Sequence, residues 1–204
     1  MRIKLLISFS LLLGIQQLKA IHPLRQAIVN ASNWQDAKNI YSTYTSTQKE
    51  IVWKDKIEEV FQSKNWSNQQ LKVINELLLN LNADIFIDGS PQDIKFKKFL
   101  SSWRGEAIAS LGLANYNNAF ITIHPFNAPK AEYISGSGGN GGTDCTCNIG
   151  ATFTCDWLLQ SNECNQIECK LVDIGCGELW RLSCDGLCTA IAGTSTVGSV
   201  LKIW

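Results

Sequence analysis

The sequence predicts a mainly α-helical amino-terminal bundle followed by a small, irregular, disulfide-rich module at the carboxy terminus. Apolar residues recur at spacings of three and four from about residue 21 to residue 113, which is typical of amphipathic helices. All eight cysteines lie within residues 145–188. We therefore expect four parts: a signal peptide (1–20), a helical leader or pro-region (21–134), a glycine-rich linker (135–142) and a cysteine-rich module (143–204).

The first twenty residues have the pattern of a secretory signal peptide. A basic end with Arg2 and Lys4 precedes an apolar stretch over residues 5–15, and Ala20 is a small residue at which signal peptidase can cut. The apolar stretch is shorter than the roughly twenty residues that cross a bilayer as a helix. We therefore expect a secreted protein that is exported through this signal.

Helix starts are marked by residues whose side chains cap free backbone amides. An early helix is expected over about residues 24–44, and a strand-like run at residues 120–123. Three further starts, each ahead of an apolar stripe, are Thr47 with Glu50, Ser67 with Gln70, and Ser90 with Pro91 and Asp93.

The glycine run over residues 136–142 predicts a flexible linker. It contains a GxGxxG pattern at Gly136, Gly138 and Gly141, but a dinucleotide site needs a strand before this pattern and a helix after it. A cysteine-rich segment follows instead. The composition therefore favours a boundary between two units.

An even number of cysteines in a short exported segment indicates a disulfide framework, because so small a segment cannot bury a sufficient apolar core. Eight cysteines allow 105 pairings, so the connectivity stays open. Zinc is the alternative, but an oxidising compartment and the absence of CxxC spacing weigh against it. The framework comprises Cys145, Cys147, Cys155, Cys164, Cys169, Cys176, Cys184 and Cys188.

Within the module, the segment GCGELW over residues 175–180 stands out. Gly175 and Gly177 flank Cys176, which predicts a tight turn with positive φ angles. Trp180 has two interpretations. It either packs over a disulfide as the centre of a very small core, or lies exposed as a possible contact for a target.

Charge and motifs exclude several classes of function. The whole chain has a formal net charge of zero, and residues 144–204 carry seven acidic and three basic residues, a net charge of −4. No basic patch for nucleic acid is present. His22 and His124 each lie beside a proline in an expected loop, and no GxSxG or CxxC motif occurs. We expect no enzyme, no catalytic residues, no cofactor and no metal.

The chain resembles the fulvocin C-related bacteriocin precursors. The resemblance is carried by the opening CxC (145–147), GCGELW (175–180) and CDGLC (184–188), and upstream by WKDKIEEV (53–60) and NQQLKVINELL (68–78). It implies a bacterial, exported antibacterial peptide that is made with an amino-terminal extension. The spacings between residues 155 and 169 fit the family loosely, and sixteen residues follow Cys188.

The leading hypothesis is a precursor whose helical region holds a disulfide-rich effector that acts on other bacteria. Its expected partners are signal peptidase, a protease that cuts the glycine run, and a protein or cell-envelope component of the target. Because the module is acidic, binding driven by anionic lipids is disfavoured. The alternative is a non-toxic secreted binding or structural module, such as an inhibitor or adhesin, in which the chain stays intact.

Overall fold

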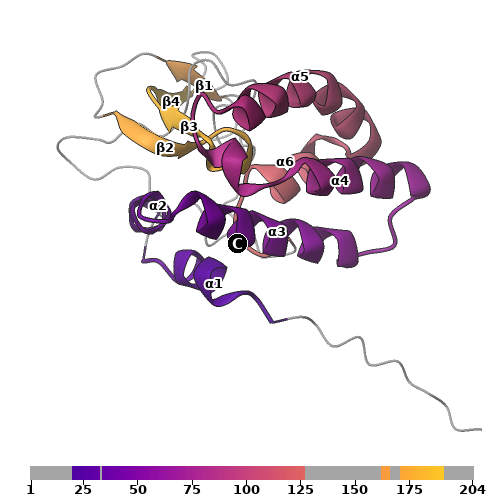
Figure 1. The fold of residues 1–204 in the computed structure, drawn as a ribbon, viewed down its shortest axis with the longest axis horizontal. Coiled ribbons are helices and arrows are strands. Elements are labelled where there is room, and N and C mark those ends of the chain that lie inside the picture. Colours follow the sequence, from indigo (N-terminus) through magenta and orange to yellow (C-terminus); the bar gives the residue numbers. More distant parts are fainter. Residues whose placement is uncertain (1–19, 33, 127–161, 166–170, 191–204) are drawn as a thin grey trace, which may run out of the picture.

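The computed structural model describes residues 20–32, 34–126, 162–165 and 171–190, and its architecture is mainly helical (Figure 1). Residues 1–19 of the expected signal peptide, the linker, Cys145, Cys147, Cys155, Cys169 and the chain after residue 190 lie outside the described residues. The helices are α1 (Pro23–Val29), α2 (Trp34–Ser42), α3 (Ser46–Gln62), α4 (Asn68–Asn80), the 3-10 helix η1 (Ala83–Phe86), α5 (Pro91–Leu111) and α6 (Leu113–Phe120).

Two short antiparallel strand pairs follow the helices in the described chain. β1 (Asn162–Asn165) pairs with β4 (Leu187–Ala190), and β2 (Val172–Cys176) pairs with β3 (Leu182–Cys184). The backbone register sets Cys164 opposite Cys188. The 3-10 helix η3 (Glu178–Trp180) connects β2 to β3. Figure 1 shows the strands gathered at one end of the helices, near α2 and the start of α5.

Aromatic side chains fill the space between the helices. The Trp103 indole donates a hydrogen bond to the Val73 carbonyl at 3.0 Å, which joins α5 to α4. The Trp103 ring also lies 5.2 Å from Phe120 and 5.9 Å from Tyr116, measured between ring centroids. Large buried aromatic groups contribute much of the apolar burial that stabilises a small domain. These contacts join α5 to both α4 and α6.

Capping signals located two of the helix starts correctly. Ser67 caps α4 and Ser90 caps α5, in each case by accepting a hydrogen bond from a backbone amide of the first turn. For α3 the expected cap was wrong by two residues. Thr45, rather than Thr47, forms the capping box, with Gln48.

Two other expectations about local structure were wrong. The early helix is divided, because α1 ends at Val29 and α2 begins at Trp34. Residues 30–32 are Asn, Ala and Ser, and the polar side chains of Asn and Ser favour turns over helix interiors. Residues 120–123 form no strand, since α6 continues to Phe120 and no strand lies beside this run in the described chain.

The helices and the described part of the cysteine-rich segment share one hydrophobic core. Leu179 and Trp180 belong to the same buried cluster as the core residues of the helices, and their exposed fractions are 0% and 1%. The described residues on the two sides of the glycine run therefore contribute to one core rather than to two separate cores. No helix in the described ranges has the length and hydropathy of a membrane span.

Candidate functional site

The candidate site is a loop of the cysteine-rich segment seated among the helices. We call residues 175–184 the plug loop; it includes the end of β2, η3 and β3. A disulfide between Cys176 and Cys184 closes the loop, so the expected framework is observed for this pair. In the chain-entropy model, a bridge across about eight residues stabilises the fold by ~2.5 kcal/mol. The loop is thus a small covalent ring.

The two expected glycines shape this ring. Gly175 has a φ of 116° and Gly177 a φ of 67°, which are values that glycine adopts without strain. A Cβ atom on Gly177 would lie 2.7 Å from Cδ1 of Leu182, and one on Gly175 would lie 3.0 Å from Cγ of Lys38. The positive φ angles therefore favour glycine at both positions, and the short contact with Leu182 adds a steric reason at Gly177.

Two residues without this freedom also adopt left-handed conformations. Leu179 has a φ of 57° and Trp180 a φ of 52°. Such conformations are unfavourable for L-residues and persist where surrounding contacts determine them. Both side chains are fully buried, so the contacts with the helices supply that determination.

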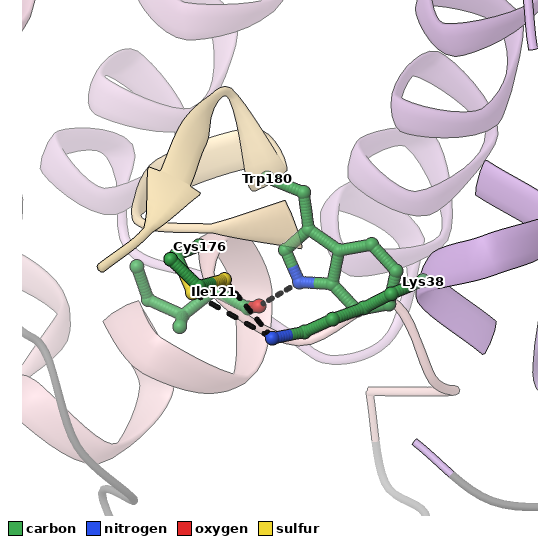
Figure 2. The surroundings of a disulfide bond; sticks show 5 residues. Lys38, Ile121, Cys176 and Trp180 are labelled. Atoms are coloured by element: carbon green, nitrogen blue, oxygen red, sulfur yellow. Dashed lines mark hydrogen bonds between the residues drawn. A yellow bond between two sulfur atoms is a disulfide. The ribbon is translucent and has the colours of Figure 1, made fainter. Parts of the chain in front are cut away.

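Trp180 occupies the centre of the site. Its indole donates a hydrogen bond to the Ile121 carbonyl at 2.9 Å, as Figure 2 shows. Edge-on contacts surround the ring, with Tyr41 at 5.3 Å and Trp53 at 6.5 Å between centroids. The Tyr41 hydroxyl accepts a hydrogen bond from the Trp53 indole and donates one to the Leu179 carbonyl. The tryptophan therefore lies neither at the surface nor in a separate small core.

Glu178 anchors the loop to α5 and α6. Its Oε1 accepts hydrogen bonds from Nε of Arg104 at 2.6 Å and from the Tyr116 hydroxyl at 3.0 Å. The Glu178 side chain is 6% exposed. Burial and the adjacent Glu178 charge raise the pKa of Tyr116, so its hydroxyl stays protonated and can donate. Charge-assisted bonds of this kind are about twice as strong as neutral ones.

Arg181 anchors the other side of the loop. It forms a buried ion pair with Asp93 in the first turn of α5, and its Nε donates to the Ile85 carbonyl at 2.9 Å. Its guanidinium carbon lies 4.7 Å from the centroid of the Phe96 ring. The loop thus places an acid, an aromatic ring and a base, in that order, against matching groups on the helices.

Lys38 of α2 lies against the disulfide. Its Nζ is 3.1 Å from Sγ of Cys184 and 3.6 Å from Sγ of Cys176, and the whole residue is 1% exposed. Figure 2 shows the lysine side chain pointing toward the two sulfur atoms beside Trp180. A cation at this position would stabilise a thiolate if the bond were reduced. The disulfide is thus part of the contact with the helices.

Residues 121–126, which we call the strap, follow α6, and the Ile121 carbonyl accepts the hydrogen bond from Trp180. Arg25 of α1 holds the strap by donating from Nε to the Ile123 carbonyl at 2.8 Å. The Arg25 guanidinium also pairs with Asp55 at 3.1 Å and with Glu59. Glu59 in turn accepts a hydrogen bond from the Phe126 amide at 2.7 Å. A buried arginine and a partly exposed glutamate therefore hold the strap to α1 and α3.

Lys56 of α3, which contacts the strap, makes the stability of the chain depend on pH. Lys56 donates from Nζ to the His124 carbonyl at 2.5 Å. Burial, with a smaller contribution from Arg25, lowers the pKa of Lys56 to about 7 from 10.5. Between about pH 7 and pH 10.5 the unfolded chain binds a proton on this lysine that the folded chain does not, so the free energy of unfolding should rise with pH across that window. Urea unfolding at a series of pH values measures this slope.

Two variants test this assignment. Lys56→Met should flatten the slope above pH 7, whereas Lys54→Met, at an exposed position of the same helix, should leave it unchanged. An unaltered slope above pH 7 in Lys56→Met would contradict the role of Lys56.

His124 in the strap adds a second dependence on pH. Burial lowers the pKa of His124 to about 4 from 6.5, so the free energy of unfolding should fall as the pH decreases across that range.

The sequence singled out the loop but not the groups that receive it. Gly175, Gly177, Cys176, Cys184 and Trp180 all belong to the plug loop, whereas His22 caps α1 and His124 is half-buried in the strap. The receiving polar groups that were missed are Lys38, Tyr41, Arg104 and Tyr116, and Asp93 was expected only as an acid near the amino end of a helix.

One signal could have found two of the missing charges. Asp93 falls in phase with Phe96 and Leu100 on the buried face of α5, and Lys38 falls in phase with Tyr41 on α2. A charged residue on the apolar face of a helix needs a buried partner. Arg104 and Tyr116 carry no comparable signal.

The site is a set of complementary contacts between the plug loop and the helices. The plug loop is held by an ion pair at each side and an aromatic ring in the centre. Among the described residues, no group of three or more His, Cys, Asp or Glu side chains is placed to hold a metal ion. Comparisons of the chain with protein-family models, with curated proteins and with solved structures gave no match.

Proposed function

We propose that this chain is an exported precursor in which the helical region covers the functional loop of an antibacterial, disulfide-rich module. The observation that carries this proposal is the burial of Trp180 in the core of the helices, at 1% exposure. An exposed tryptophan of a small rigid module is a typical anchor for a protein partner. In the intact chain this anchor is covered, as expected for an inactive precursor.

The distribution of cysteines supports the same proposal. Residues 1–144 contain no cysteine, so no disulfide bond can join the helical region to the module. A cut within the glycine run would leave the module with its complete set of cysteines. The likeness of residues 175–180 and 184–188 to fulvocin C-related precursors supplies the antibacterial activity in the proposal.

The target is proposed to be a protein or another specific component of the bacterial envelope. Residues 144–204 carry a net charge of −4, which opposes adsorption to anionic lipids. The Glu178 and Arg181 side chains flank Trp180 and would add charged contacts once the loop is uncovered. Recognition therefore depends on a specific surface rather than on bulk charge.

Growth inhibition tests the proposal. The oxidised full chain, carrying a protease recognition sequence within residues 136–142, is cut and separated in denaturant so that the disulfides persist. We expect the separated module to inhibit strains related to the producer and the uncut chain to be inactive. A module that inhibits no such strain, together with an intact chain that binds a defined partner, would refute the antibacterial function.

The shared core favours a second candidate, a secreted binding or structural protein that stays intact. Leu179 and Trp180 complete the buried cluster of the helices, as in a chain that folds as one unit. Mass spectrometry of culture supernatant separates the two candidates. A fragment beginning near Gly142 supports the precursor, whereas intact chain from about Ile21 supports the second candidate.

A further inference from the structure

The contacts between the plug loop and the helical region are all non-covalent. The partners of the loop are Tyr41, Asp93, Arg104 and Tyr116 on the helices and Ile121 in the strap, all of which precede the glycine run. None of these contacts passes through the linker. A cut in the linker would therefore leave every one of them in place, and cleavage alone would not release the module.

The site selects its occupant by both charge and shape. Glu178 meets Arg104, and Arg181 meets Asp93, so the two charges of the loop face opposite charges in a defined order. Between them, Trp180 enters a space bounded by aromatic rings. An occupant with the charges exchanged would place like charges together, which costs binding free energy. The order of charges in the site therefore matches that of this loop.

An emptied site would be unfavourable. Asp93 and Tyr116 are nearly inaccessible to water while the loop is bound, at 1% and 0% exposure. Without the loop, Asp93 would lose its ion pair with Arg181, Tyr116 would lose its hydrogen bond to Glu178, and the ring of Tyr41 would face water. Exposed aromatic surface of this kind tends to be covered again by binding. Recapture of a module is the favourable outcome.

We propose that the site on the helices is a receptor for the plug loop in trans. Once cut, the helical region binds the module of a second copy of this chain and neutralises it. This inference rests on the proposed function, because neutralisation presupposes an active module. The binding step itself depends only on the contacts described above.

Partner exchange between cut chains tests the inference. One preparation carries an affinity tag on the helical region, and the other carries a module labelled with a heavy isotope. The two are cut within residues 136–142, mixed in mild denaturant and returned to buffer. We expect helical region and module to co-elute in size-exclusion chromatography, and the tagged helices to capture the heavy module.

Charge reversal makes the test specific. Arg104→Glu in the helical region should weaken capture of the module at least about tenfold, because Glu178 would face a like charge. Glu178→Arg in the module should restore capture by the Arg104→Glu helices. Lys98→Glu is the matched control, because this lysine is an exposed residue of the same helix, and it should leave capture unchanged.

The outcomes separate this inference from the proposed function. Three results would overturn the receptor: cut chains that separate without denaturant, capture that Arg104→Glu does not weaken, or weakened capture that Glu178→Arg does not restore. Any of these results would leave growth inhibition by the module unaffected. Specific capture of a module that inhibits no strain would support the receptor site and overturn the antibacterial function instead.

Discussion

Replacing Trp180 with alanine should lower the free energy of unfolding of the intact chain by about 3–5 kcal/mol, the range for truncating a buried aromatic residue. The side chain is 1% exposed and its contacts come from α2, α3 and the strap, so the cavity would lie at their junction. Unfolding by urea, followed by far-ultraviolet circular dichroism, measures the loss without relying on tryptophan fluorescence.

Two variants calibrate this result. Trp180→Phe keeps a ring in the site but loses the hydrogen bond to the Ile121 carbonyl, so it should cost roughly 1–3 kcal/mol. Leu79→Ala, at a residue that is 76% exposed, should change stability by less than about 0.5 kcal/mol. If Trp180→Ala matched Leu79→Ala, the plug loop would not belong to the core of the helices in solution.

Local sequence patterns predicted the starts of α4 and α5 correctly because capping depends on residues three positions apart. Ser67 with Gln70 defines the start of α4 without ambiguity. Residues 45–50 contain two overlapping patterns of the same kind, and the backbone selects the first, with Thr45 as the cap. The error of two residues at α3 reflects this overlap.

The position of the plug loop could not be predicted in the same way. Tyr41 and Leu179 are separated by 138 positions, and Lys38 and Cys184 by 146. No periodicity or spacing reports a contact over such distances. The sequence predicted a turn at Gly175 and Gly177 from backbone chemistry, but which surface covers that turn depends on the folded helices.

The cysteine pattern predicted that the cysteine-rich segment folds as a module independent of the helices. A cysteine-dense segment beyond a glycine run resembles an independent module, because disulfides can replace a core. The described part of this segment has both a disulfide and residues buried in a hydrophobic core. Cys176 and Cys184 form a bridge, while Leu179 and Trp180 between them enter the core of the helices. Cysteine density indicates cross-linking but does not exclude burial against another region.

Replacing Asp93 with asparagine should destabilise the intact chain by about 3–5 kcal/mol, because it leaves the Arg181 charge buried without its carboxylate partner. The two side chains are 2% and 4% exposed. Burial favours the neutral acid, but hydrogen bonds from Lys97 and the Gly89 amide and the charge of Arg181 outweigh it and lower the pKa of Asp93. This carboxylate therefore stabilises the fold above about pH 4, and its contribution is lost as the pH falls further.

A matched control and a double variant distinguish the ion pair from other effects. Asp88→Asn removes a carboxylate that is 97% exposed and also pairs with Lys97, so it should cost less than about 1 kcal/mol. Adding Arg181→Met to Asp93→Asn removes the stranded charge and should recover part of the loss. Equal destabilisation by the single and double variants would mean that Asp93 acts through Gly89 and the start of α5, and not by holding the plug loop.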